Sequence, residues 1–361
     1  MKTATPAMAR AINDRLALDL LLERGPLTAP QLRTLTGLSR PTVSDLIERL
    51  VDGGLIEVTG ECGEDRRGPK ARLYGIVAGR AHVAGVDVRR VAVNVTVADI
   101  TGATVGTAVR DLPGGTGGHV HPDAPGGLAD RDVSGEPDLV ALVESAVAAA
   151  AGGRALDTVV IGAPGLVDPR TGDLVSGNDV PGWGRGFLES VRRRLGVPVV
   201  LENEVNLAAV AEHRSGAAAG SDDFVLMWLD DGVGAAVVLD GRLRRGMSGG
   251  AGEIGLLDVN GATLCHVVDA QVARGLDVGE LARRIAVGAF ALVTVLDPGL
   301  VVLGGKTGRA GGDKLAGLVA ERLRELSPAP TRVLGSTVAG NAILQGAVLT
   351  ALDTARDKIF G

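Results

Sequence analysis

The chain has 361 residues, of which 45% are hydrophobic and 22% charged, so it has ample core material for two or three folding units. Aromatic residues make up only 2%, which argues against stacking platforms for single-stranded nucleic acid. The net charge is −6, yet the first 80 residues contain more Lys and Arg than Asp and Glu. This asymmetry favours the N-terminal part as the region that approaches a polyanion.

Cysteine usage and hydropathy indicate the compartment. The two cysteines, Cys62 and Cys265, provide neither a disulfide framework nor a C-x-x-C pair. The N-terminal run MKTATPAMARAIND lacks the apolar stretch of a signal peptide, and no segment approaches ~18 uninterrupted apolar residues. We therefore expect a cytoplasmic protein with no membrane partner.

The first predicted domain, residues 1–79, begins with a helical pattern. Residues 11–22 place Ile12, Leu16 and Leu20 on one stripe at helical spacing. This spacing predicts a helix that buries the stripe, and a Gly-Pro pair ends it.

Two more helices and two strands follow in this domain. Thr28 is suited to cap a short second helix, and Ser39 is suited to cap a third. Residues 55–60 and 72–77 have strand patterns and enclose a polar loop. Three helices followed by a two-stranded hairpin form a winged helix-turn-helix.

The third helix and the loop of the hairpin carry side chains suited to double-stranded DNA. A recognition helix inserts its N-terminal turns into the major groove, and a wing offers cations to phosphates or to the minor groove. The predicted DNA-binding residues are Ser39, Arg40, Thr42, Ser44 and Asp45 in the helix and Arg66, Arg67 and Lys70 in the wing. The alternative interpretation is a small helical protein-interaction module with a charged loop.

Residues 80–200 are predicted to form a first α/β lobe that starts with a Val-rich strand hairpin. Within it, residues 111–138 are rich in Gly, Pro and Asp, and we interpret them as a flexible surface insertion. His119 and His121 of this insertion carry metal-ligand atoms. A Gly-rich tether does not preorganise a metal site, so we interpret them as loop residues.

From Asp157 onward, several ordered motifs resemble the ROK family, which groups bacterial repressors, open reading frames and sugar kinases. The similar runs are ALDTVVIGAPGLVDPRTGDLVSGNDVPGWG, VPVVLENEVNLAAVAEH, DGVGAAVVLDGRLRRGMSGGAGEIG and LDPGLVVLGG. The likeness covers residues 80–355, and the N-terminal module also resembles that of ROK repressors. The resemblance implies an α/β fold in which the winged helix-turn-helix precedes a two-lobed, actin-like sugar-kinase unit. Lobe 2 is then expected at 201–340, with the C-terminal helix, 341–361, returning to lobe 1.

Both phosphate-binding motifs depart from the family pattern. The first resembles D-x-G-G-T in ROK kinases, but the run from Asp87 is D-V-R-R-V, and Arg does not easily take the φ > 0 conformations of Gly or admit a close phosphate. The second resembles G-T-G-x-G, but the run from Asp230 is D-D-G-V-G, which places two carboxylates where a triphosphate would lie. We therefore do not expect ATP binding.

The catalytic and zinc motifs are also altered. In the family, E-N-D-A-N supplies an Asp base; here Glu204 takes its place, one methylene longer, and a misplacement of ~1 Å can cost ~100-fold in rate. Glu204 is thus a degenerate base position, and we assign no catalytic residue. Leu256 replaces the His of G-E-I-G-H, and of the following Cys-rich run only Cys265 and His266 remain. One Cys and one His do not close a four-ligand zinc site, so no metal is predicted.

Part of the sugar pocket implied by the resemblance survives. Amide and carboxylate side chains suit sugar hydroxyl groups in a preformed cleft. The candidate ligand-binding residues are Asn178, Asn203, Glu204 and Glu253. The alternative is that they are inherited scaffold residues with ordinary local hydrogen bonds.

The preferred hypothesis is a DNA-binding transcriptional regulator that is not an enzyme and needs no cofactor. By family resemblance it is a repressor that binds double-stranded operator DNA as a homodimer or higher homo-oligomer, with a sugar or sugar derivative as effector. One alternative is an ATP-dependent sugar kinase with an attached DNA-binding domain, which the altered motifs argue against. The other is a ligand-insensitive scaffold or oligomerisation protein, which leaves the basic wing and the capped helix unexplained.

Overall fold

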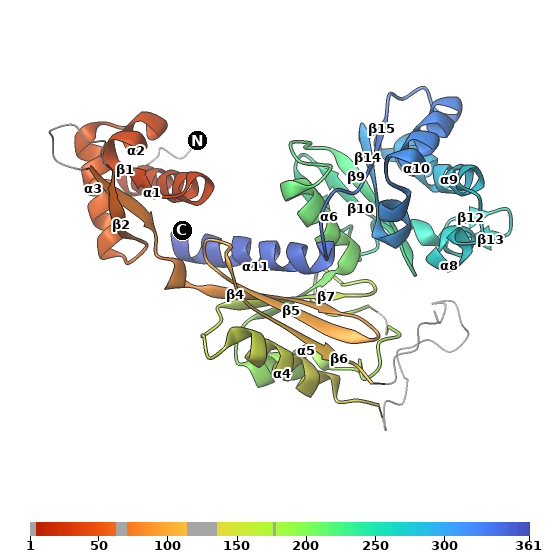
Figure 1. Ribbon diagram of the computed structural model, residues 1–361, viewed down its shortest axis with the longest axis horizontal. Coiled ribbons are helices and arrows are strands. Elements are labelled where there is room, and N and C mark those ends of the chain that lie inside the picture. The colour runs from red at the N-terminus through yellow and green to blue at the C-terminus, as the bar shows by residue number, and fades with distance from the viewer. Residues whose placement is uncertain (1–4, 63–70, 114–135, 176–177) are drawn as a thin grey trace.

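The computed structural model describes residues 5–62, 71–113, 136–175 and 178–361. Along the chain a small helical module is followed by two α/β lobes, and one long C-terminal helix runs beneath the module and the second lobe (Figure 1). This is the mixed α/β architecture predicted from the sequence. Among the described residues, no helix is long and apolar enough to cross a membrane.

The N-terminal module contains three helices and a small antiparallel sheet. Its elements are α1 (Pro6–Arg24), β1 (Leu27–Thr28), α2 (Ala29–Thr36), α3 (Arg40–Asp52), β2 (Ile56–Cys62) and β3 (Ala71–Ile76). The predicted hairpin of β2 and β3 is present, but the sheet has a third strand, because β1 pairs with β3. β1 was missed because two residues are too few to show an alternating pattern. Thr28 caps α2, as predicted, and the structure adds a capping box with Gln31.

The predicted buried face of α1 is wrong. Ile12 and Leu16 are 60% and 41% exposed, whereas the core of the module takes Ala17, Leu18 and Leu21. The C-terminal half of α1 is apolar on more than one side, so its periodicity does not determine which side meets the other helices.

The first lobe is a mixed sheet with strand order β6-β5-β4-β7-β8. Its strands are β4 (His82–Val88), β5 (Ala92–Asp99), β6 (Thr104–Asp111), β7 (Thr158–Ala163) and β8 (Val199–Asn203). Helices α4 (Leu139–Ala151) and α5 (Phe187–Leu195) cover one face, and α11 (Ala342–Phe360) lies on the other (Figure 1). β8 pairs with β7 up to Asn203, so the predicted lobe boundary at residue 200 falls inside a strand.

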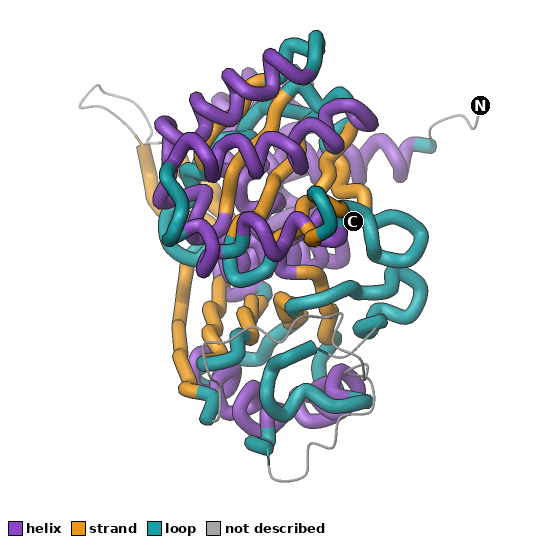
Figure 2. The backbone as a smooth tube through the Cα atoms, turned by 90° about the vertical axis from the view of Figure 1, so that its right-hand side faces the viewer, coloured by secondary structure: helices purple, strands orange, loops and turns teal. Residues whose placement is uncertain are grey.

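The second lobe has a sheet of order β11-β10-β9-β14-β15. Its strands are β9 (Phe224–Leu229), β10 (Val233–Leu239), β11 (Arg242–Arg244), β14 (Leu300–Gly304) and β15 (Arg332–Gly335). Viewed from the side of this lobe, its long helices α9 (Val278–Leu296) and α10 (Gly305–Leu326) lie over the strands (Figure 2). The smaller elements are η1 (Ala78–Arg80), η3 (Ile254–Leu256), β12 (Asp258–Val259), β13 (Ala262–Thr263), α7 (Leu264–Val268) and α8 (Ala270–Ala273).

The lobes meet through two helices that pack closely. α6 (Glu204–Ser215) starts where β8 ends, and it packs against both α11 and the second sheet. A Cβ atom on Gly346 of α11 would lie 1.8 Å from the backbone oxygen of Leu207 in α6, and a Cβ on Gly85 of β4 would lie 2.7 Å from Val348. Glycine at these two positions therefore lets α11 approach both α6 and the first sheet.

Candidate functional site

The N-terminal turns of α3 present polar side chains to solvent. Ser39 caps the helix: its Oγ accepts a hydrogen bond from the Thr42 backbone N–H and lies 2.8 Å from the Thr42 hydroxyl. Arg40, Ser44 and Asp45 are exposed. The opposite face is buried by Val43, Leu46, Ile47 and Leu50. The helix thus has one face in the core and a polar face free at its N-terminal end, which is the arrangement that groove insertion requires.

The predicted wing contacts stay predictions. Arg66, Arg67 and Lys70 lie outside the described residues, between the ends of β2 and β3. At the base of the wing, Arg72 of β3 is exposed. Arg72 was not singled out from the sequence, although its position in a strand next to a basic loop is a usable signal.

The cleft between the lobes is organised around Arg89, which replaces the first glycine of the kinase phosphate loop. Its Nε lies 2.9 Å from Oδ1 of Asp87, a residue only 1% exposed at the end of β4. The Asn341 side chain donates a 2.7 Å hydrogen bond to the other oxygen of Asp87. Burial by itself would lower the pKa of Arg89, but the carboxylates of Glu204, Asp87 and Asp230 raise it, so the guanidinium stays charged.

Glu204 faces this guanidinium. It is the first residue of α6, and its Oε2 lies 3.4 Å from Nη1 of Arg89. Burial raises the pKa of Glu204 and the nearby Arg89 opposes that shift. The position of the kinase base is therefore held by an internal ion pair.

The second altered loop is also neutralised internally. Nζ of Lys306 lies 2.9 Å from a carboxylate oxygen of both Asp230 and Asp231. Burial would lower the pKa of Lys306, but these two hydrogen-bonded carboxylates raise it. The repulsion expected from two bare carboxylates is thus reduced by a lysine that the sequence analysis missed, because it lies 75 positions away.

A cavity of about 400 Å³ lies between these two loops. Its lining includes Arg89, Asp230 and Lys306, together with Trp228 and Arg309. Four of the residues that line it are charged: Arg89, Asp230, Lys306 and Arg309.

Two of the predicted ligand-binding residues form hydrogen bonds with the backbone. The Asn178 side chain donates to the Pro164 carbonyl and accepts from the Val180 N–H. The Asn203 side chain caps α6 and donates 2.9 Å to the Gly165 carbonyl. Both amides therefore hold the loop after β7, which is the scaffold role weighed as the alternative.

Glu253 approaches the same region from the second lobe. Glu253 precedes η3. A Cβ atom on Gly234 would lie about 4.0 Å from the carbonyl oxygen of Gly252, the neighbour of Glu253, and 3.6 Å from Val205 of α6. Burial raises the pKa of Glu253, although solvent still reaches its side chain. The structure thus brings the loop that carries Glu253 to the start of α6, where Glu204 and Asn203 lie.

The remnants of the zinc motif do not form a cluster. His266 contacts the Thr263 hydroxyl through its Nδ1, 3.1 Å away. Across the described ranges, no group of three or more His, Cys, Asp or Glu side chains is arranged to hold a metal ion.

Comparison with known protein families identifies both parts of the chain. A model described as the ROK family matches residues 134–268, and one described as the MarR family matches residues 12–68. The chain carries a ROK-family domain behind a MarR-type winged helix. The order of the two matches along the chain agrees with the fold described above.

Individual relatives of this chain include both regulators and kinases. It is 20% identical over 370 residues to a xylose repressor of Caldicellulosiruptor bescii, with 88% of each chain covered. It is 32% identical over 117 residues to a glucokinase of Streptomyces coelicolor, which covers 32% of this chain and 37% of the glucokinase. Several curated relatives are matched over less than two thirds of their own length.

Among solved structures, a ROK family transcriptional regulator described as a homologue of the E. coli MLC protein has the same fold. It matches with a TM-score of 0.70 over 98% of both chains, at 18% sequence identity. This similarity extends over the winged helix and both α/β lobes. The two structures therefore share the same two-part architecture.

Proposed function

We propose that this protein is a DNA-binding transcriptional regulator of the ROK family, a repressor, whose kinase-like unit acts as a sensor. The observation that carries the proposal is the recognition helix. Arg40, Ser44 and Asp45 are exposed at its N-terminal end while its other face is buried in the winged helix. Relatives named as xylose repressors, which match over 88% and 72% of this chain, support the same function.

The sensor is proposed to lack phosphoryl transfer and to need no ATP or metal. Arg89, in place of a loop glycine, is paired with Asp87 and Glu204. A kinase base must face the substrate hydroxyl, whereas Glu204 faces an internal cation. Incubating the protein with Mg-ATP and a panel of aldohexoses and aldopentoses is expected to give no sugar-dependent ADP; clear turnover would favour the sugar-kinase alternative, which the similarity to glucokinases keeps as a second candidate.

A sugar or sugar derivative is the proposed effector, bound between the lobes near Asn203, Glu204 and Glu253. The names of the xylose and N-acetylglucosamine repressor relatives support this ligand class. In a homodimer, a ligand that favours one closure of the lobes would change the spacing of two winged helices and hence the affinity for paired half-sites.

The direct test is recovery of the operator. Purified protein is incubated with fragmented genomic DNA of its source, bound fragments are sequenced, and the best fragment is titrated against salt. A recurrent, roughly palindromic site with clear preference over random DNA supports the regulator. No enrichment at low salt, where electrostatic binding is strongest, would favour the scaffold alternative.

A further inference from the structure

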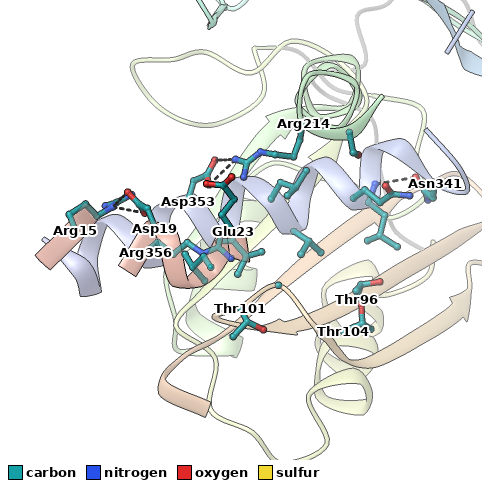
Figure 3. Close-up of a pocket in the computed structure, with 18 residues that line it drawn as sticks. Arg15, Asp19, Glu23, Thr96, Thr101, Thr104, Arg214, Asn341, Asp353 and Arg356 are labelled. Atoms are coloured by element: carbon teal, nitrogen blue, oxygen red, sulfur yellow. Dashed lines mark hydrogen bonds and ion pairs between the residues drawn. The ribbon is translucent and has the colours of Figure 1, made fainter. Parts of the chain in front are cut away.

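A groove of about 1000 Å³ separates the winged helix from the first lobe (Figure 3). Its walls are α1, α11, the end of α6 and the hairpin of β5 and β6. It shares only Asn341 with the lining of the inter-lobe cavity. Arg356 lies about four turns further along α11, about 22 Å from Asn341. The groove is therefore a separate cavity at the junction of the two modules.

Two of the three arginines that line this groove are neutralised within it (Figure 3). Arg15 of α1 forms ion pairs with Asp19 at 3.1 Å and with Asp357 at 3.0 Å. Arg214 of α6 forms one with Asp353 at 3.2 Å. These pairs satisfy both arginines and their carboxylates.

Arg356 is different. Its Nε donates a 3.0 Å hydrogen bond to the Ile100 carbonyl, and within the described part of the chain no carboxylate forms an ion pair with it. The side chain is half-buried, and burial lowers the pKa of Arg356. The carboxylates of Asp353 and Asp19 raise this pKa, and the guanidinium groups of Arg214 and Arg15 lower it. Since both carboxylates already form ion pairs with those two arginines, Arg356 has no ion-pair partner of its own among the described residues, and an anion in the groove would stabilise its charge.

The surrounding side chains suit a small polar ligand. The groove is lined by hydroxyl and amide side chains, together with aliphatic ones: Thr96, Thr101, Thr104, Ser215, Gln345 and Leu349. A guanidinium with free terminal nitrogens binds carboxylates and phosphates through two parallel hydrogen bonds. We propose that Arg356 anchors a small hydroxylated anion, a phosphate monoester or a carboxylate, in this groove between the winged helix and the sensor.

Glu23 of α1 gives the proposal a second, opposite test. It also lines the groove, and its ion pair in the described structure is with its neighbour Arg24, at 3.9 Å. A carboxylate at the edge of an anion site repels the ligand. Removing the charge of Glu23 should therefore strengthen anion binding, whereas removing that of Arg356 should weaken it.

The experiment is isothermal titration calorimetry of the full chain at low chloride with inorganic phosphate, glucose 6-phosphate and glucose. We expect both phosphates to bind in the millimolar range or tighter, and glucose not to reproduce that binding. Arg356→Gln is expected to weaken phosphate binding by ~10-fold or more, and Glu23→Gln to strengthen it by a few-fold. Arg242→Gln, which removes an equal charge from an exposed position on β11, is the matched control and should change neither. Tighter binding of glucose 6-phosphate than of phosphate would identify the esterified sugar as the better ligand; equal binding would identify the anion alone.

The proposal is overturned if neither phosphate binds at about 10 mM, or if Arg356→Gln binds phosphate with unchanged affinity. Should Arg356→Gln fail to fold, the Glu23→Gln result decides: unchanged or weaker binding rejects the groove. The inference does not depend on the proposed function, because Arg309→Gln, which removes a cation from the lining of the inter-lobe cavity, should leave phosphate binding unchanged. Loss of binding in Arg309→Gln alone would place the anion in the cleft and reject this site.

Discussion

Replacing Arg40 by Ala should weaken specific DNA binding without weakening the fold. Arg40 is the first residue of α3 and is exposed, while the residues that hold the helix in the module are on its other face. The change in the free energy of unfolding should stay within about 0.5 kcal/mol, as for other surface substitutions. Removing a cation from a helix N-terminus is slightly favourable to the helix.

The loss of affinity follows from what an arginine at this position contributes. A bidentate contact to a base edge is worth ~1–3 kcal/mol, which corresponds to a ~5- to ~150-fold increase in the dissociation constant. Glu48, exposed two turns later on α3, is the matched control. Because only the first turns insert, Glu48→Ala should leave affinity unchanged or raise it slightly by removing a negative charge near phosphates.

The assay is fluorescence anisotropy on the recovered operator and on a scrambled duplex at fixed salt. Arg40→Ala should lose affinity for the operator more than for the scrambled duplex. An unchanged operator affinity, with both variants folded as judged by circular dichroism, would show that this end of α3 does not enter the groove. A larger effect from Glu48→Ala would move the contact surface toward the C-terminal turns.

Three further predictions concern the wing, the packing of α11 and the two ion pairs of Glu280. Replacing Arg66 and Arg67 by Ala should lower affinity for all DNA sequences and flatten the slope of log affinity against log salt by ~0.9 for each phosphate that the wing no longer neutralises. Gly85→Ala should destabilise the protein by ~1–3 kcal/mol in urea unfolding, because its Cβ would lie 2.7 Å from Val348. Two arginines hold the pKa of Glu280 at about 2, below its usual 4.5. The stabilising contribution of the Glu280 carboxylate is therefore present above about pH 4.5 and lost as the pH falls through about 2. Replacing Glu280 by Gln should lower the midpoint of thermal unfolding at neutral pH and should not lower it at pH 2.

Each of these has an outcome that contradicts it. An unchanged salt slope would remove the wing from the interface with DNA. Gly79→Ala is the control for Gly85→Ala, since a Cβ on Gly79 meets no atom within 4 Å; equal effects of the two would mean that the contact with α11 is not the cause. A difference between wild type and Glu280→Gln that is independent of pH would show that the ion pairs of Glu280 do not contribute.

The sequence predicted the DNA-binding module well because its signals are local. Caps at Thr28 and Ser39 and the polar loop between two strands are short-range features, and all the elements they mark are present. The buried side of α1 was predicted wrongly, since an apolar residue such as Ile12 satisfies the helical period whether or not a neighbour covers it.

In the candidate site, too, the sequence showed some features and only the folded structure showed others. Its altered motifs were evident from the residues themselves, because a glycine replaced by Arg89 or an aspartate replaced by Glu204 is visible without a structure. What those residues do was not evident. Two arginine pairs illustrate the difference: Arg89 with Glu204 joins β4 to α6, and Arg15 with Asp357 joins α1 to α11.

The sequence by itself thus determined which modules this protein has, in what order, and which kinase residues are missing. The tertiary structure decided which charges are paired, since Lys306 meets Asp230 and Asp231 only after β9 and β14 align side by side. It also decided which charged side chains have no ion-pair partner among the described residues, such as Arg356 in the groove between the modules. The physical reason is that helix and strand patterns arise from neighbours a few positions apart, whereas pairing and burial of charge depend on residues that only the folded chain brings together.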